Sequence, residues 1–360
     1  MKLLIISQKA DKNDQVLGFF HCWVEEFAKN CEEIKFICLE KGVINLPANV
    51  EIFSLGKNNS WQKSKLNKLF GKIRAVYNFY FIVFSQTKNY DAVFVHMNPE
   101  YIILGGWWWK LVNKKISMWY AHGTVNIKLK LAIWLADIVF TSTDQGLPVT
   151  TPKKIIVGQG IDTEFFKFYP RLRGDIAKLL SVGRISETKD CLFIIKIAEK
   201  LHQNGVAIKL FFVGDTVTLV DKKYKAELLD YIKENNLGEI IEFVGSKTSG
   251  QVLDFLHQAD IMLSASRNKS LDKTIVEAIA TGLPVLTAND SGRVLLSTIC
   301  PDCIFTPNDL EEAVIKAGKI LSLNLMDYYG LGQNLRQLVE TEHSLNRLIK
   351  EKILAYLQND

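Results

Sequence analysis

The sequence predicts an α/β protein built from two doubly wound domains, and two observations carry this prediction. Short apolar or aromatic runs alternate with segments of helical spacing along most of the 360 residues. The runs are continuously apolar, which is typical of parallel strands covered by helices on both faces. They fall into two series separated by an irregular segment, which favours two domains over one. A chain of this length, with 48% hydrophobic residues, can bury sizeable cores without metals or disulfides.

The first series predicts a strand at 3–6 and ends near residue 160. Its other expected strands are 34–39, 92–97, 116–121, 137–142 and 154–160. Helical spacing connects them near 19–30, 62–86, 99–112 and 126–136.

The second series predicts strands at 177–183, 208–214, 240–245, 260–265 and 283–288. Helical patterns separate them near 188–203, 219–236, 249–258 and 272–281, and residues 308–358 are mostly helical. The boundary between the series is expected near 161–175, where charge is mixed, a proline and a glycine occur, and no period persists.

Charge is unevenly distributed along the chain. The net charge is +5, but residues 52–136 hold twelve basic residues and only two acids, Asp91 and Glu100. That stretch therefore carries +10 and the rest of the chain −5. The total is too small to name a partner, and no nucleic-acid-binding motif is recognised, so a nucleic-acid partner is not expected.

The six cysteines are scattered, and free thiols in a reducing cytoplasm are expected. Cys300 and Cys303 form one CxxC pair, but no second pair with zinc-site spacing lies nearby, so no metal site is predicted and the role of the pair stays open. No signal peptide and no run long enough to span a membrane are expected.

Ligands of open α/β sheets bind beyond the carboxyl ends of the strands. With two sheets, the expected site is a cleft between the domains, and residues that follow strands are the first candidates. Gly18 lies in a polar loop after the first strand and before a helix. A glycine there lets backbone amides approach an anion, although an ordinary loop glycine explains it equally well.

The first strand of the second series is followed by the segment SVGRISETK, which contains Arg184 and Lys189. Two cations between a strand end and a helix start suit a diphosphate. The alternative is a pair of solvated surface cations.

A short predicted helix, DKTIVEAIA, stops at Gly282 before a buried strand and carries Glu277 among small residues. A carboxylate in that position could hold ribose hydroxyls. The alternative is a helical ion pair with Lys273, four residues earlier.

Together these segments resemble the retaining glycosyltransferases of family 4, the glycosyl transferases group 1. SVGRISETK is similar to the family element G-R-L-x-x-x-K-G, and TIVEAIATGLPVL to E-A-M-A-x-G-x-P-V. FFVGD resembles the V-G-x-G strand end, VGQGIDTEFF the segment N-G-V-D-x-x-x-F, and ADIVFTST the pattern A-D-x-V-x-x-x-S. The matches run in the family's order along most of the chain.

The resemblance implies the GT-B fold, with two Rossmann-like domains facing a cleft and a C-terminal helix that returns to the first domain. The expected domains are an acceptor-side domain at 1–165, a nucleotide-sugar-binding domain at 166–335 and the crossing helix at 336–360. It also implies sugar transfer with retention and without a metal. No Asp-x-Asp motif, which metal-dependent glycosyltransferases use, occurs in the sequence.

Residue roles follow from the same resemblance. Arg184 and Lys189 would bind the donor diphosphate and stabilise the leaving nucleotide, Glu277 would accept hydrogen bonds from ribose, and His122 would lie near the transferred sugar. A packing or capping histidine is the alternative for His122. The remaining expected donor contacts are Gly18, Gly183, Gly214, Lys269, Ser270, Leu271, Asp272 and Lys273.

Several positions depart from the family pattern. Lys269 stands where the family has a second glutamate that contacts the donor sugar, and Asp272 is an alternative source of a carboxylate at a different place in the loop. The family glycine after the lysine is Asp190 here, and the second glycine of V-G-x-G is Thr216. Nucleotide binding is therefore better supported by the sequence than sugar recognition.

Residues 62–88 predict a basic helix. Leu66, Leu69, Ile73, Val76 and Tyr80 recur at helical spacing beside a row formed by Lys65, Lys68 and Lys72. A core helix with a solvated basic face and an interfacial helix on anionic lipid are both consistent with this pattern. Basic residues near anionic lipid contribute ~1 kcal/mol each, so a peripheral membrane contact is one expectation for this stretch.

The leading hypothesis is a cytoplasmic glycosyltransferase, at the inner face of the plasma membrane if lipid is bound. It would use a UDP- or GDP-type donor and no other cofactor, with a glycan, lipid or lipid-linked acceptor in cell-surface glycan or glycolipid synthesis. The alternatives are a catalytically impaired GT-B nucleotide-binding scaffold and a GT-B nucleotide-sugar epimerase. A dinucleotide oxidoreductase is disfavoured, because no strand-to-helix turn contains G-x-G-x-x-G.

Overall fold

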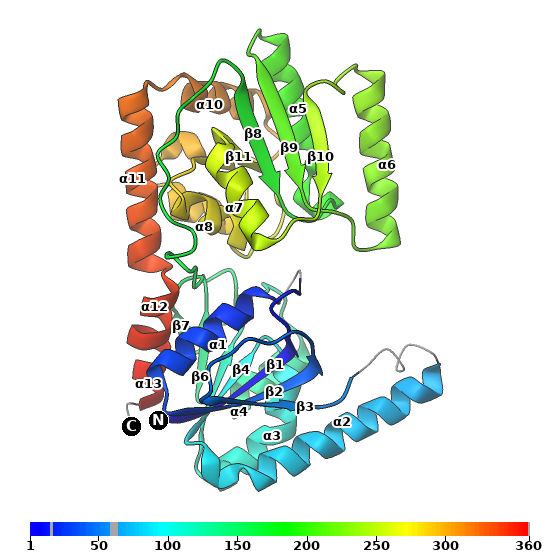
Figure 1. Cartoon of the computed structure of the whole chain (residues 1–360), viewed down its shortest axis with the longest axis vertical. Coiled ribbons are helices and arrows are strands. Elements are labelled where there is room, and N and C mark those ends of the chain that lie inside the picture. The colour runs from blue at the N-terminus through cyan, green and yellow to red at the C-terminus, as the bar shows by residue number, and fades with distance from the viewer. Residues whose placement is uncertain (15–16, 58–63, 359–360) are drawn as a thin grey trace. The chain divides into compact units, whose positions relative to one another are not determined.

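The structure is a computed structural model that describes residues 1–14, 17–57 and 64–358. It divides into two compact units (Figure 1). Unit 1 comprises Met1–Gly160 and Leu345–Asp360, and unit 2 comprises Ile161–Ser344. The boundaries expected from the sequence, at 165/166 and 335/336, lie a few residues away from these.

Hydrogen bonds within unit 2 explain where its first residues belong. The backbone N–H of Ile161 donates to the carbonyl of His343 at 2.7 Å. Arg336 donates to the carbonyls of Phe166 at 2.5 Å and Thr163 at 3.0 Å. Residues 161–166 are therefore held by the end of unit 2, although their irregular sequence reads as a linker.

Unit 1 contains a seven-stranded parallel sheet with the order β3-β2-β1-β4-β5-β6-β7. Its strands are β1 Lys2–Ala10, β2 Glu33–Lys41, β3 Val50–Ser54, β4 Ala92–His96, β5 Lys115–Trp119, β6 Ile138–Thr141 and β7 Lys154–Ile156. Its helices are α1 Phe19–Asn30, α2 Lys65–Ser85, η2 Thr87–Asn89, α3 Pro99–Leu111, α4 Ile127–Leu135, α12 Leu345–Arg347, η5 Leu348–Leu354 and α13 Ala355–Gln358.

Helices cover both faces of this sheet, and each face has its own core. On one face α2, α3 and α4 pack through residues such as Phe79, Trp109 and Leu129. On the other, α1 packs beside η5, whose Leu348 and Ile353 join Trp23 and Phe27 in a second cluster. The C-terminal helical segment is therefore part of unit 1, as the fold class predicted.

Unit 2 contains a five-stranded parallel sheet with the order β10-β9-β8-β11-β12. Its strands are β8 Ala177–Val182, β9 Ile208–Val213, β10 Ile241–Gly245, β11 Ile261–Ser264 and β12 Val285–Thr287. Its helices are η3 Glu187–Lys189, α5 Cys191–Gln203, α6 Leu219–Glu234, α7 Ser249–Gln258, α8 Lys273–Ala280, α9 Asp290–Leu296, η4 Pro301–Cys303, α10 Leu310–Ser322 and α11 Leu325–Glu342.

Every predicted strand is present, and β3 is the strand that the sequence analysis missed. β3 lies at the edge of its sheet and is half-exposed, so it lacks the continuous apolar run of its neighbours. A charged pair marks it instead, because Lys35 Nζ on β2 lies 2.5 Å from Glu51 Oε2 on β3. Cross-strand ion pairs of this kind stabilise sheet edges.

Two further expectations are corrected. Leu66, Leu69, Ile73 and Val76 do not form the buried face of α2; they are exposed, because the helix contacts the sheet through the row Ala75, Phe79, Ile82 and Val83.

The cysteines are not all free thiols either. Cys300 and Cys303 form a disulfide, which the turn of η4 permits by bringing their Cα atoms to 5.2 Å. Cys22, Cys31, Cys38 and Cys191 are free.

Candidate functional site

Two glycines mark the carboxyl edge of the sheet in unit 2. Gly183 follows β8 with φ +147° and Gly214 follows β9 with φ +140°. A Cβ atom on Gly214 would lie 1.9 Å from the carbonyl oxygen of Gly183, so no side chain fits there. Only glycine allows the two strand ends to approach this closely, and the backbone N–H groups of Gly183 and Gly214 donate to the carbonyls of Val213 and Gly245 at 2.9 and 3.0 Å.

Lys189 lies at this edge, at the end of η3. A Cβ atom on Gly183 would lie 3.5 Å from Lys189 Cε. The ammonium nitrogen of Lys189 is 2.7 Å from Oδ2 of Asp272, the residue before α8. Both side chains are largely buried, with 19% and 10% exposed. The ion pair therefore brings two segments that the sequence predicted independently to one place.

Asp190 explains one departure from the family pattern. Its φ is +49°, in the left-handed region where glycine is usual and aspartate is tolerated. Its carboxylate accepts hydrogen bonds from Nη2 and Nε of Arg267 at 2.6 and 3.1 Å. The backbone N–H of Arg267 also donates to the carbonyl of Thr188 at 2.9 Å. Asp190 thus keeps the turn and gains a link to the loop before α8.

Arg184 is exposed and follows Gly183 directly. Within the part of the chain that the structure describes, no hydrogen bond or close ion pair holds its guanidinium. Its charge acts on Asp221 at the start of α6: the pKa of Asp221 is lowered, mainly by the hydrogen bond from the backbone of Thr218 and in smaller part by Arg184. Arg184 is therefore available to an anion from solvent.

The loop before α8 is fixed by polar residues that the sequence analysis did not single out. Asn289, fully buried after β12, donates its side-chain amide to the carbonyls of Asn268 at 2.6 Å and Ser270 at 3.1 Å. Ser291 Oγ donates to the carbonyl of Lys269 at 2.6 Å. Three consecutive carbonyls are thus turned towards β12. Both residues follow a buried strand, and the rule used for the other strands could have found them.

The side chains of this loop divide into anchored and open ones. Leu271 is buried and anchors the loop in the core of unit 2. The side chain of Lys269 is exposed, and Ser270 is half-buried. The position of Lys269 is therefore fixed through its backbone, while its ammonium group is directed to solvent.

Glu277 lies buried inside α8. Its Oε1 accepts a hydrogen bond from Lys273 Nζ at 2.5 Å. The helical ion pair that the sequence offered as the alternative to ribose binding is thus present. This ion pair holds the Glu277 carboxylate beside the preceding turn of the helix, where the side chain of Lys273 is partly exposed.

The other two predicted residues lie in unit 1. Gly18 precedes α1 with an ordinary helical φ of −55°, but a Cβ atom there would lie 2.5 Å from the carbonyl oxygen of Asp14. His122 is exposed, and its Nδ1 lies 3.2 Å from Oγ1 of Thr124. Gly18 is therefore required by close packing of its own loop, and His122 is open to solvent.

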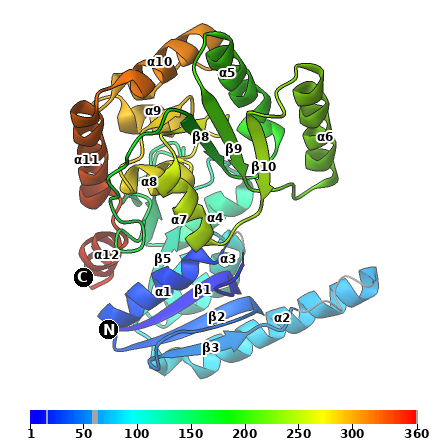
Figure 2. The same ribbon diagram turned by 45° about the horizontal axis from the view of Figure 1, so that its top comes forward.

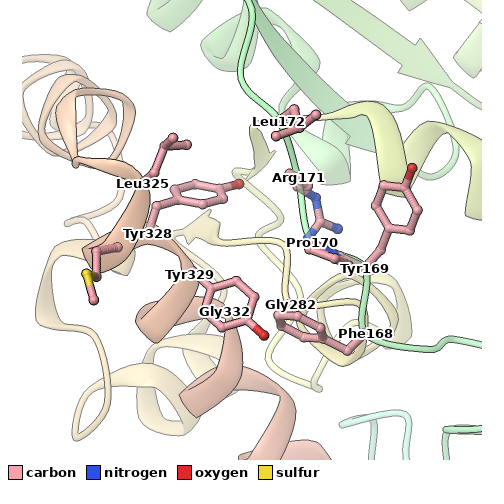
Figure 3. A pocket seen from close by; sticks show the side chains of 11 residues that line it. Phe168, Tyr169, Pro170, Arg171, Leu172, Gly282, Leu325, Tyr328, Tyr329 and Gly332 are labelled. Carbon is pink, nitrogen blue, oxygen red and sulfur yellow. The ribbon is translucent and has the colours of Figure 1, made fainter.

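A cavity of unit 2 lies away from these residues. It has a volume of about 430 Å³ and is lined mainly by aromatic and aliphatic side chains from residues 168–172 and from α11. Figure 3 shows Phe168, Tyr169, Tyr328 and Tyr329 around it, and the rings of Phe168 and Tyr329 are 5.4 Å apart. The guanidinium of Arg171 donates hydrogen bonds to the carbonyl oxygen and to the hydroxyl oxygen of Thr281. None of the predicted site residues lines this cavity.

Among the described residues, no three His, Cys, Asp or Glu side chains are grouped so that they could hold a metal ion.

Comparisons with known proteins agree on the fold. Residues 162–322 match the family model of glycosyl transferases group 1. The structure is similar to Anabaena HepE in complex with UDP, with a TM-score of 0.76, 15% identity and 99% of each chain covered. It is also similar to sucrose-phosphate synthase from Thermosynechococcus elongatus, with a TM-score of 0.74, 16% identity and 99% and 98% of the two chains covered.

One curated relative is similar in sequence. Protein CapJ of Staphylococcus aureus is 26% identical over 159 residues, which is 42% of this chain. The aligned part spans 37% of the length of CapJ. The structural similarity over the whole length shows the GT-B fold, and the match to the family model of glycosyl transferases group 1 is confined to residues 162–322.

Proposed function

We propose that the protein transfers a sugar from a nucleotide-sugar donor to an acceptor hydroxyl, with retention of configuration and without a metal ion. The observation that carries the proposal is the arrangement at the ends of β8 and β9. There the guanidinium of Arg184, which no described residue binds, and the ammonium of Lys189 flank two glycines that carry no side chain. Two cations beside a strand edge without side chains suit the diphosphate of a nucleotide-sugar.

Each residue has a role in this proposal. Arg184 and Lys189 stabilise the negative charge that develops on the leaving nucleoside diphosphate, and Asp272 holds Lys189 in place before the sugar bond breaks. Glu277 accepts hydrogen bonds from the ribose hydroxyls through its carboxylate. His122 acts near the transferred sugar, as the family resemblance implies.

The donor in this proposal is of the UDP or GDP type, and UDP is favoured because HepE is described in complex with UDP. The acceptor is a glycan, a lipid or a lipid-linked glycan, and the reaction belongs to cell-surface glycan or glycolipid synthesis. The protein would work in the cytoplasm, at the inner face of the plasma membrane. An acceptor held at a membrane is consistent with the exposed apolar and basic helix α2.

The test is thermal unfolding in the presence of UDP, GDP, ADP or CMP, for the wild type, Arg184→Ala and Arg347→Ala. Arg347 lies on α12 in unit 1, so its variant controls for the loss of an arginine elsewhere. We expect one diphosphate to raise the melting temperature of the wild type and of Arg347→Ala but not of Arg184→Ala. Turnover of the matching nucleotide-sugar should then be lost in Arg184→Ala. An Arg184→Ala protein that still turns over the donor would refute the proposed role.

A second candidate is a nucleotide-binding scaffold with little or no turnover. Two observations favour it: the exposed Lys269 stands where the family has a sugar-contacting glutamate, and Asp272 already neutralises Lys189. This candidate predicts that a nucleoside diphosphate binds while no nucleotide-sugar is consumed with any acceptor extract. Consumption of a donor sugar would exclude it.

A further inference from the structure

We propose that α2, with the adjoining outer surface of α3, binds the surface of a bilayer that contains anionic lipid. The observation that raises the question is the exposure of large apolar side chains along α2. Phe70, Tyr77 and Phe81 are 61%, 69% and 64% exposed. Contiguous apolar surface of this kind on a soluble unit marks an interaction site.

The exposed side chains lie on one stripe of the helix. With about 3.6 residues per turn, positions four, seven and eleven residues apart share a face. The stripe opposite the buried row of Ala75, Phe79 and Ile82 consists of Leu66, Phe70, Ile73, Tyr77, Phe81 and Phe84, and all six are exposed. The helix is thus apolar on the face that the sheet does not use.

The apolar stripe continues into an aromatic cluster with α3. The ring of Phe84 lies 4.8 Å from that of Trp108 and 6.2 Å from that of Trp107, and Tyr80 stacks on Phe84 at 5.5 Å. Trp107 is half-exposed. Tryptophan and tyrosine favour the boundary between lipid headgroups and acyl chains, because their rings are apolar with one polar atom.

Charge identifies the partner. Residues 66–85 contain no acidic residue. Lys88 and Lys110, close in sequence to Phe84 and Trp107, are exposed, and no ion pair with another described residue neutralises them. Lys68 and Lys72 are also exposed, but they precede Ala75 and Phe79 by seven residues and so lie on the side of the helix opposite the apolar stripe. A second copy of the chain placed symmetrically on this face would bring like charges together, which opposes a dimer. An anionic lipid surface is complementary in both charge and hydrophobicity.

The position of α2 suits a helix that lies on a membrane. Figures 1 and 2 show its first turns projecting beyond the edge of the sheet formed by β3, and residues 66–70 are exposed all round the helix. Among the described helices, none is long and apolar enough to cross a bilayer. Residues 62 and 63 of the stretch expected to contact lipid lie outside the described residues, so the proposal begins at Ser64.

Co-sedimentation with vesicles tests the proposal, without donor or acceptor. One set of vesicles contains phosphatidylcholine alone and the other equal parts of phosphatidylcholine and phosphatidylglycerol. We expect the wild type to bind the anionic vesicles at least tenfold more tightly than the neutral ones. All seven tryptophans lie between residues 23 and 134, so a blue shift of tryptophan emission should accompany binding.

A matched pair of variants distinguishes this face from exposed apolar residues in general. Ile73→Glu on α2 and Ile315→Glu on α10 change residues that are 57% and 60% exposed. Ile73→Glu should reduce binding to anionic vesicles at least tenfold, and Ile315→Glu should leave it unchanged. Lys88→Gln with Lys110→Gln should weaken binding and reduce its sensitivity to salt.

Three results would overturn the proposal: equal binding to both kinds of vesicle, equal effects of the two glutamate variants, or a wild-type dimer that Ile73→Glu converts to a monomer without any vesicle binding. The last result would assign the face to a second copy of the chain. Because the assay contains no nucleotide-sugar, its outcome is independent of the proposed transfer reaction.

Discussion

The ammonium group of Lys189 and the carboxylate of Asp272 lie 2.7 Å apart at the carboxyl edge of the sheet in unit 2. This pair joins the turn after β8 to the start of α8. It also places a negative charge at a position where the proposed donor would bring a diphosphate. The balance between these two charges leads to the first prediction.

Asp272→Asn should strengthen the binding of the nucleoside diphosphate that stabilises the wild type. The amide keeps the shape of the side chain but no longer neutralises Lys189 or repels phosphate. We expect an increase of several-fold to about tenfold, the range of a single partly screened charge interaction. Isothermal titration calorimetry measures it, with Lys189→Ala as the variant that should lose affinity. Weaker binding by Asp272→Asn would show that the carboxylate positions Lys189 instead of competing for it.

Gly214→Ala should destabilise unit 2 and abolish nucleotide binding. The added Cβ atom would collide with the carbonyl oxygen of Gly183, and φ of +140° is unfavourable for alanine. Such strained positions cost on the order of 1–3 kcal/mol. Chemical denaturation followed by far-UV circular dichroism measures the change. Gly238→Ala is the control, because a Cβ atom there meets no atom within 4 Å and its φ is ordinary.

Asn289→Ala should free the loop before α8. The substitution removes the donors to the carbonyls of Asn268 and Ser270 and leaves those groups without partners in a buried position. Losing such hydrogen bonds costs ~1–3 kcal/mol. Under the proposed function, KM for the donor should rise more than kcat falls, because the loop is mispositioned while Arg184 remains.

Ser291→Ala provides the graded comparison for Asn289. This substitution removes the hydrogen bond from Ser291 Oγ to the carbonyl of Lys269. It should raise KM for the donor by a smaller factor than Asn289→Ala. Hydrogen exchange at residues 268–272 should rise in both variants. Unchanged exchange in Asn289→Ala would contradict the positioning role.

Unit 1 should lose stability as the pH falls below about 6.5, the pKa of an ordinary histidine. His96 is buried at the end of β4, stacked on Phe20 at 4.1 Å, and its burial lowers its pKa to about 3. The unfolded chain takes up a proton near pH ~6.5 and the folded unit does not, so stability is complete above that pH and declines towards pH 3. The loss should reach roughly 4 kcal/mol at the acid end.

Tryptophan fluorescence during denaturation at several pH values measures this decline, because all tryptophans belong to unit 1. His96→Leu should flatten the dependence on pH. The control is His202→Leu, which changes an exposed histidine of α5. Equal pH profiles for the wild type and His96→Leu would exclude His96 as the cause.

The buried strands could be predicted because they are continuously apolar, and the glycines and cations at their ends follow from the geometry of parallel sheets. β3 could not be predicted in this way. It pairs with one strand only, and its side chains are half-exposed, so its sequence is not continuously apolar. The sequence also left two interpretations of α2. Spacing alone identifies an apolar stripe, but only the packing of Ala75 and Phe79 against the sheet shows that this stripe is not the buried one.

The candidate site is easier to predict where a residue type has one evident use. Gly214 and Lys189 follow strands and are of types that the sequence analysis associates with a phosphate. Asn289 also follows a strand, but its type indicates no ligand, because its contacts are to backbone carbonyls of a loop distant in sequence. Asp190 is a similar case: its left-handed backbone and its bond to Arg267 depend on the tertiary structure.

The course of the chain through the two units has a consequence for synthesis. Leu348, Ile349 and Ile353 are fully buried against the face of the first sheet that α1 covers, and Asn346 donates to Glu26 at 2.8 Å. These residues leave the ribosome only after the whole of Ile161–Ser344, which is a continuous segment. Unit 2 can therefore form its core without any residue outside that segment. Unit 1 begins earlier in the chain, yet its cluster on the α1 face is complete only when the residues that follow unit 2 have joined it.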